Sequence, residues 1–197
     1  MWEPAATESI TTWSQVNPEY PEEDLVLFGP GSESGTYDFF AEEIADPDSE
    51  EPALREDYEA SEDDNVLVEG VANELLALGF FGFSYYDENK DTLRALPLDG
   101  VEPTVDTIAD GSYPLSRPLF IYVSTKALDE NPAVEPFVTY YLENATTLVE
   151  EAAYVPLPDS TLQESRTQFM DRTTGTLYDE SGELPSGDLE TSLKDSQ

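Results

Sequence analysis

The sequence predicts an α/β fold with largely parallel sheets. Two observations predict it: short apolar runs that suit buried strands alternate with segments of helical spacing, and the first of those runs leads through a loop of small residues directly into a helix. Such alternation is typical of strand–helix–strand units, whose strands run parallel. The chain has 197 residues, which is enough for one or two compact domains with a core.

The first strand and helix are the clearest elements. The apolar residues 25–28 form the predicted strand, which Gly29-Pro30-Gly31 ends, and residues 37–44 have the spacing of a helix. Residues 45–63 are acidic, carry two prolines and are expected to form a loop. A strand therefore meets a loop of small residues, and that loop opens a helix.

The next elements continue the alternation. Asp63-Asp64-Asn65 is expected to cap a helix over residues 66–78, which Gly79 ends, and residues 80–86 are predicted to be a strand. Further strands and helices follow in order: a strand at 93–98, a helix at 104–109, a buried strand at 119–123, and helices at 132–153 and 161–172.

The charge of the chain is strongly acidic. It holds 44 Asp and Glu against 8 Lys and Arg, with no His, for a net charge of −36. Nucleic acids and anionic membrane surfaces both need a positive footprint, so neither is an expected partner. Because the acids are spread through segments that look folded, we interpret them as a surface of carboxylates suited to high salt. In molar salt the Debye length is about 3 Å and self-repulsion is weak.

Several chemistries lack the residues they need. Without Cys or His the chain has no disulfide, no thiolate and none of the usual zinc sites. No Lys follows the glycines near residue 31, so the loop is not a Walker A motif, and a serine nucleophile would have no histidine base. A hydrolase with paired carboxylates stays open on composition alone. No window approaches 18 uncharged apolar residues, and no signal peptide opens the chain.

The loop after the first strand is the candidate site. At the start of the following helix, Ser34, Gly35 and Thr36 can present backbone N–H groups, and the helix dipole favours an anion there. The two hydroxyl groups add donors, so a small oxyanion could bind without a cation. The local pattern equally fits a serine that caps an ordinary helix.

Five ordered segments together resemble the substrate-binding proteins of phosphate ABC transporters, the PstS/SphX-like family. The match runs from about Trp2 to about Tyr178 and rests on these strings: LFGPGSESGT at 27–36, ASEDDN at 60–65 with GVA at 70–72, GFFGFSYY at 79–86, YPLSRPLFIYV at 113–123, and YVPLP at 154–158.

The resemblance implies a type II periplasmic-binding-protein-like fold, with two α/β lobes joined by a hinge. The long segment with which the family begins has no counterpart here, so we expect the first lobe to be incomplete. The implied division is a lead-in at 1–14, the second lobe with the phosphate loop at 15–113, a return to the first lobe at 114–172, and an acidic, flexible tail at 173–197.

The same resemblance implies the site. It assigns Ser34, Gly35 and Thr36 to phosphate, while the first-lobe donors and the aspartate that accepts the phosphate proton have no match in this chain. The family's arginine before the loop is also missing, because Gly29-Pro30-Gly31 occupies that stretch. Ser32, Arg117 and Arg55 are further candidates, although a salt bridge to one of the many acids is the preferred interpretation of both arginines, and more so of Arg55.

The implied function is capture of inorganic phosphate outside the cytoplasmic membrane and its delivery to the permease subunits of an ABC importer. We expect a monomer with no catalysis, no metal and no cofactor, located in the periplasm or at the cell surface. A lipid anchor in the missing N-terminal segment stays open. The alternatives are a phosphate-sensing or adhesion module on the same fold, and a phosphate-ester hydrolase.

Overall fold

A computed structural model describes residues 1–178 and 189–195 of the chain. These residues form two compact units, 1–96 and 97–197, and each is described by itself.

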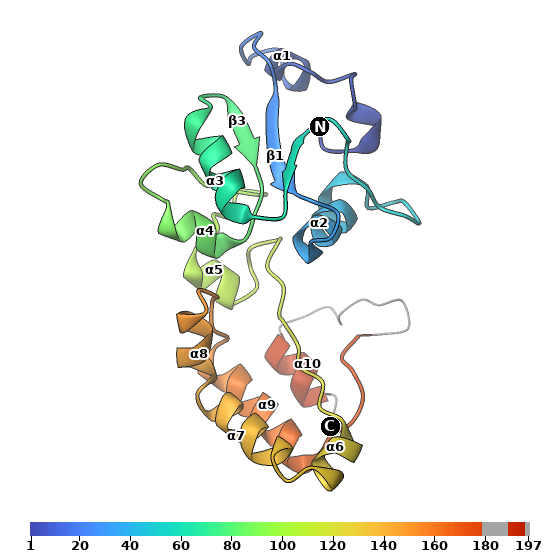
Figure 1. Ribbon diagram of the computed structural model, residues 1–197, viewed down its shortest axis with the longest axis vertical. Helices are drawn as coiled ribbons and strands as arrows, with labels where there is room; N and C mark the ends of the chain where they lie inside the picture. Colours follow the sequence, from blue (N-terminus) through green and yellow to red (C-terminus); the bar gives the residue numbers. More distant parts are fainter. Residues whose placement is uncertain (179–188, 196–197) are drawn as a thin grey trace. The chain divides into compact units, whose positions relative to one another are not determined.

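The first unit is built on a parallel sheet of three strands in the order β2-β1-β3. The central strand β1 (Val26–Pro30) pairs with β2 (Glu59–Ser61) and with β3 (Ala77–Gly79), as Figure 1 shows. In the register, Pro30 faces Ser61 and Phe28 faces Gly79. The carboxyl ends of the three strands therefore meet at one edge, and this confirms the predicted α/β fold with a parallel sheet.

Capping side chains mark where two helices of this unit begin. Helix α2 (Gly35–Phe40) begins after Ser34, whose Oγ accepts a hydrogen bond from the Thr36 amide, and a π-helical stretch, η2 (Ala41–Ala45), continues it. Helix α3 begins after Asp63, whose carboxylate accepts from the Asn65 amide. Helix α3 spans Asp64–Asn73, and the other helices of the unit are η1 (Pro4–Ala6), α1 (Trp13–Val16) and α4 (Phe83–Glu88).

An aromatic cluster anchors the beginning of the chain in this unit. Trp2 is only 6% exposed and packs edge-on against Phe40, Tyr58 and Phe80. Phe40 and Phe80 stack with ring centroids 3.9 Å apart. Leu67 of α3 is fully buried, and α3 packs against all three strands. The beginning of the chain is therefore part of the core of this unit.

The prediction for residues 74–86 was wrong in its boundaries. Helix α3 ends at Asn73, and residues 77–79, expected to finish the helix, form β3 instead. The expected strand at 80–86 is largely helix α4, with Gly82 at its N-cap. The physical reason is pairing: the backbone of 77–79 finds an open edge of β1, which a short apolar run cannot reveal by itself.

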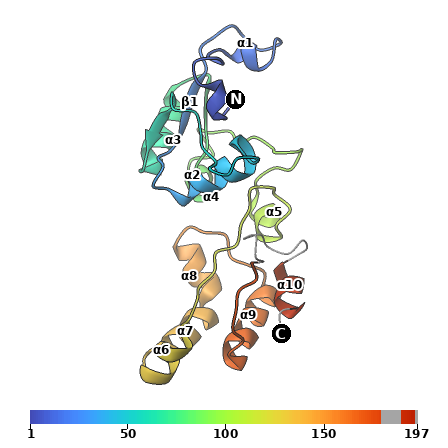
Figure 2. The same cartoon turned by 90° about the vertical axis from the view of Figure 1, so that its right-hand side faces the viewer.

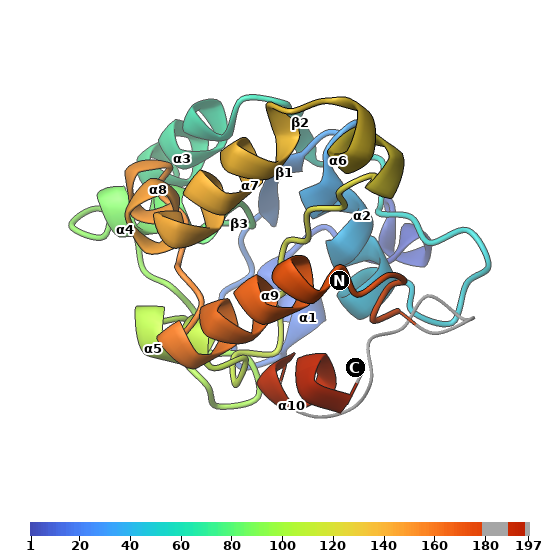
Figure 3. The same ribbon diagram turned by 90° about the horizontal axis from the view of Figure 1, so that it is seen from below.

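The second unit is helical in the part that the structure describes. Helix α9 lies between α7 and α10, as Figures 2 and 3 both show. The helices of the second unit are α5 (Val105–Ala109), α6 (Thr125–Glu130), α7 (Val134–Glu143), α8 (Ala145–Glu151), α9 (Asp159–Asp171) and α10 (Leu189–Asp195). The predicted helices at 104–109 and 161–172 are confirmed. The long helix expected at 132–153 is broken at Asn144 into α7 and α8.

Two expected strands are absent from the described residues. Residues 93–98 form no strand, and Leu98 makes a single bridge to Val101. Residues 119–123, predicted as a buried strand, form no strand and leave Leu119 68% and Tyr122 66% exposed. An apolar run becomes a strand only beside a partner strand, and the described part of the second unit supplies none.

The end of the chain is partly helical. The expected flexible tail began at residue 173, but α10 packs on α9, with Leu193 only 6% exposed and its carbonyl accepting from Gln168 Nε2 at 2.6 Å. Residues 179–188 and 196–197 lie outside the described residues. Among the helices of the described segments, none has the length and apolar character required to span a bilayer.

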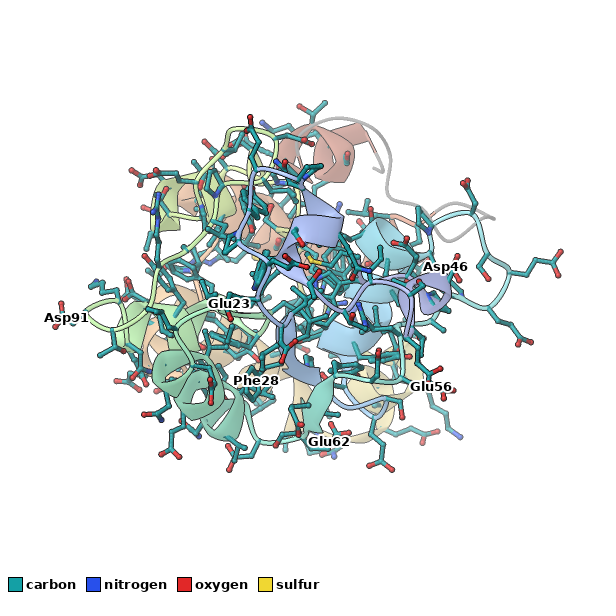
Figure 4. The ribbon with its side chains drawn as sticks, turned by 90° about the horizontal axis from the view of Figure 1, so that it is seen from above. Glu23, Phe28, Asp46, Glu56, Glu62 and Asp91 are labelled. Atoms are coloured by element: carbon teal, nitrogen blue, oxygen red, sulfur yellow. The ribbon has the colours of Figure 1, made fainter. Side chains whose placement is uncertain are left out.

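The carboxylates lie on the outside, as the charge pattern indicated. Glu23, Glu56, Glu62 and Asp91 are exposed. Figure 4 shows acidic side chains extending outward from the ribbon, whereas Phe28 of the central strand lies in the interior of the view. Most of the net charge of −36 therefore lies on the solvent-exposed surface.

Candidate functional site

The candidate site lies where the central strand ends. The Gly31 amide donates to the Ser61 carbonyl at 3.3 Å, so the loop after β1 leaves the sheet beside the end of β2. Tyr58 secures the same point, since its hydroxyl donates to the Pro30 carbonyl at 2.8 Å. Burial raises the pKa of Tyr58 to about 12, so the hydroxyl keeps its proton for this bond. In parallel α/β sheets, ligands bind beyond this edge.

The three predicted phosphate residues come together at the start of α2. The Ser34 amide donates to the Gly31 carbonyl at 3.1 Å, and the Thr36 amide donates to Ser34 Oγ at 3.1 Å. The serine therefore acts as a helix cap, the alternative that the sequence left open. Because Ser34 Oγ is an acceptor in that bond, its own proton stays available for donation. Ser34 and Thr36 are half-buried, while Gly35 and Ser32 are exposed.

Two carboxylates lie beside the loops at this edge, and the sequence did not single them out for this role. Glu62, just after β2, accepts a hydrogen bond from the Glu33 amide, with 3.4 Å between Oε1 and the nitrogen. The backbone of Gly82, in the loop after β3, favours the charged form of Asp64. Burial raises the pKa of Asp64, and the nearby charges of Asp63 and Glu62 add to this effect. Glu62 thus joins the loops after β1 and β2.

The Glu62 carboxylate lies close to the loop backbone at Gly31. A Cβ atom on Gly31 would lie 2.0 Å from Glu62 Oε1, so a larger residue there would displace the end of this exposed side chain. A signal for Glu62 could have come only from β2, a strand of three residues with a polar sequence. The sequence placed that stretch in a loop.

Arg55 is not available to a ligand in the structure. It is 3% exposed, and its Nε and Nη2 atoms donate to the two carboxylate oxygens of Asp57 at 2.6 and 2.9 Å. Its remaining bonds go to the Met1 and Ile10 carbonyls at 3.0 and 2.9 Å. The Arg55 guanidinium lowers the pKa of Asp57 well below its usual range. This arginine holds the N-terminal segment in place, so in the structure it does not take the role in phosphate binding that the sequence suggested.

Arg117 belongs to the second unit, where it precedes the extended residues 118–123, and its candidate role stays a prediction. Within the described residues, no three acidic side chains are grouped so that they could hold a metal ion. The site is therefore built from backbone amides, hydroxyl groups and a neighbouring carboxylate.

Comparison with known proteins identifies the family. A family model described as the PBP superfamily domain matches residues 5–145. The SphX protein of Synechocystis is 40% identical over 183 residues, which cover 90% of this chain and 54% of the relative. The phosphate-binding protein PstS of Staphylococcus haemolyticus is 39% identical over 160 residues, covering 78% of this chain and 48% of the relative. The chain thus spans about half the length of these relatives.

Solved structures agree with this result. A possible phosphate-binding protein from Planctomyces limnophilus has a TM-score of 0.73 and 37% identity, over 88% of this chain and 62% of that one. A protein from Clostridium perfringens, described as a phosphate ABC transporter substrate-binding protein with bound phosphate, has a TM-score of 0.57 and 26% identity, over 77% of this chain and 58% of that one. The chain therefore belongs to the PBP superfamily domain family, among the SphX- and PstS-like phosphate-binding proteins.

Proposed function

We propose that this chain binds inorganic phosphate through Ser34, Gly35 and Thr36 and serves, with the rest of its substrate site, as the receptor of an ABC-type phosphate importer. The observation that carries the proposal is the position of these residues at the carboxyl edge of a parallel sheet, in a chain of the phosphate-binding family. The staphylococcal relative is named a phosphate-binding protein, and the structure from Clostridium perfringens is described with bound phosphate. The side chains at this edge do not suit catalysis.

The binding would depend on short hydrogen bonds. A tetrahedral oxyanion beside α2 would accept hydrogen bonds from the Ser34 and Thr36 hydroxyl groups, and from loop amides that exchange their present acceptors for the anion. Long-range attraction cannot contribute, because the net charge of −36 repels anions at a distance. Hydrogen bonds from neutral donors act only at contact, so they tolerate the concentrated salt that weakens the repulsion.

The remainder of the receptor follows from the family. We propose that residues 15–113 belong to one lobe and 114–172 to the other, with a hinge between them that closes the lobes over phosphate. Ser32 and Arg117 stay candidates for additional contacts. The receptor would act as a monomer outside the cytoplasmic membrane and would present phosphate to the permease subunits.

Calorimetric titration tests the proposal. The 197-residue chain, in about 2 M KCl to suppress self-repulsion, is titrated with inorganic phosphate and separately with sulfate. Phosphate is expected to bind one-to-one, and Ser34→Ala is expected to weaken it about tenfold, since one hydrogen bond to a charged ligand is lost. Ser124→Ala is the matched control, because Ser124 caps α6 in the same way, in the other unit. Heat with sulfate but not with phosphate would reject the proposal.

A further inference from the structure

The Glu62 carboxylate lies directly against the loop that would hold phosphate. Its Oε1 atom accepts from the Glu33 amide at 3.4 Å and fills the space beside Gly31. Glu33 is the immediate neighbour of Ser34, and consecutive Cα atoms are only about 3.8 Å apart. Figure 4 shows Glu62 at the edge of the first unit, close to the end of β2. A bound anion and this carboxylate would therefore be near neighbours.

The charge of Glu62 is not neutralised by a cation. Within residues 1–178 and 189–195, Glu62 has no ion pair. The buried guanidinium of Arg55 is paired with Asp57. Burial is the main cause of the raised pKa values of Asp64 and Tyr58, and the charge of Glu62 contributes to both. Its field thus reaches the groups at the ligand edge.

We propose that Glu62 makes phosphate capture by this loop depend on salt. The inference rests on the proposed function. At low ionic strength the unpaired carboxylate repels the phosphate dianion, and at high ionic strength the repulsion is screened. The hydrogen bond from the Glu33 amide to Glu62 remains in either case and keeps the loop in its conformation. Phosphate affinity would then rise with salt, and Glu62 would be the residue that sets how steeply it rises.

The distances decide which effect dominates. At about 0.1 M salt the Debye length is about 10 Å, longer than the separation expected between groups on adjoining loops, so much of the repulsion remains. Above about 1 M it falls to about 3 Å, shorter than that separation. The hydrogen bond is long and exposed, so its loss would change affinity little. Repulsion therefore dominates in dilute salt, and neither effect is large in concentrated salt.

Glu62→Gln separates the two effects, because glutamine keeps an oxygen that accepts from the Glu33 amide but carries no charge. Glu69→Gln is the matched control: Glu69 is an exposed residue of α3 in the same unit, and its change alters the net charge equally. The whole chain in each version is titrated with inorganic phosphate between about 0.2 M and about 2 M KCl, and circular dichroism gives the folded fraction at each salt.

We expect Glu62→Gln to bind phosphate roughly tenfold more tightly than the unchanged chain at about 0.2 M KCl, and within roughly twofold of it at about 2 M. Glu69→Gln should follow the unchanged chain within roughly twofold throughout. Identical salt curves for the two variants, or weaker phosphate binding by Glu62→Gln in dilute salt, would overturn the inference and leave the proposed function standing. Absence of phosphate binding by the unchanged chain at every salt would overturn both.

Discussion

The Arg55 cluster makes the sharpest prediction about stability. Arg55→Ala removes a guanidinium that is 3% exposed and that bonds to Asp57 and to the Met1 and Ile10 carbonyls. Breaking a buried ion pair from one side typically costs about 3–5 kcal/mol, because the other charge is left uncompensated. The Asp57 side chain is 33% exposed, so water can compensate part of that loss. We therefore place the destabilisation near the low end, at about 3 kcal/mol.

This destabilisation is large enough to measure by thermal unfolding. For a chain of this size, about 1 kcal/mol shifts the midpoint by about 2–4 °C, so Arg55→Ala should lower it by about 6–12 °C in molar KCl. Arg94→Ala is the control, since Arg94 is exposed and its loss changes the net charge by the same amount. Circular dichroism at the helix band follows both variants. Equal midpoints for Arg55→Ala and Arg94→Ala would refute the structural role assigned to Arg55.

Other perturbations test the core and the charges of the first unit. Leu67→Ala should cost about 2–5 kcal/mol because Leu67 is fully buried, whereas Leu75→Ala, at a residue 98% exposed, should cost less than about 0.5 kcal/mol in urea unfolding. Gly70→Ala would place a Cβ 2.3 Å from the Phe28 ring, so its overpacking should outweigh the helix propensity gained and destabilise by about 1 kcal/mol. The folded-state pKa of Asp57 is lowered, so its pairing stabilises the protein above about pH 4, and that contribution is lost as the pH falls further; the stability difference from Asp57→Asn should shrink below about pH 4 and would stay constant if the pairing were unimportant.

The sequence was sufficient for the central strand, its loop and the helix that follows. The residues at the start of the central strand are apolar, and the strand pairs on both sides. The Ser34 and Asp63 caps are local features, because each accepts from an amide within three residues. Local signals of this kind survive folding, because the same residues that carry them also make the bonds.

The sequence was insufficient wherever pairing or burial decided the outcome. Residues 77–79 became a strand because β1 had an open edge, and residues 119–123 did not, because the described second unit has no strand beside them. Arg55 and Glu62 were equally ambiguous as charges in an acidic chain. Their roles depend on contacts with Ile10 and Glu33, which lie 45 and 29 residues away in sequence.

The central claim, that the loop after β1 holds phosphate, is tested most directly by amide proton–nitrogen correlation spectra of the whole chain in concentrated KCl, recorded as inorganic phosphate is added. The account predicts that the largest saturable shifts fall on residues 33–36 and that Ser34→Ala reduces them together. Shifts confined to residues 97–178, or none beyond those that added chloride produces, would contradict it.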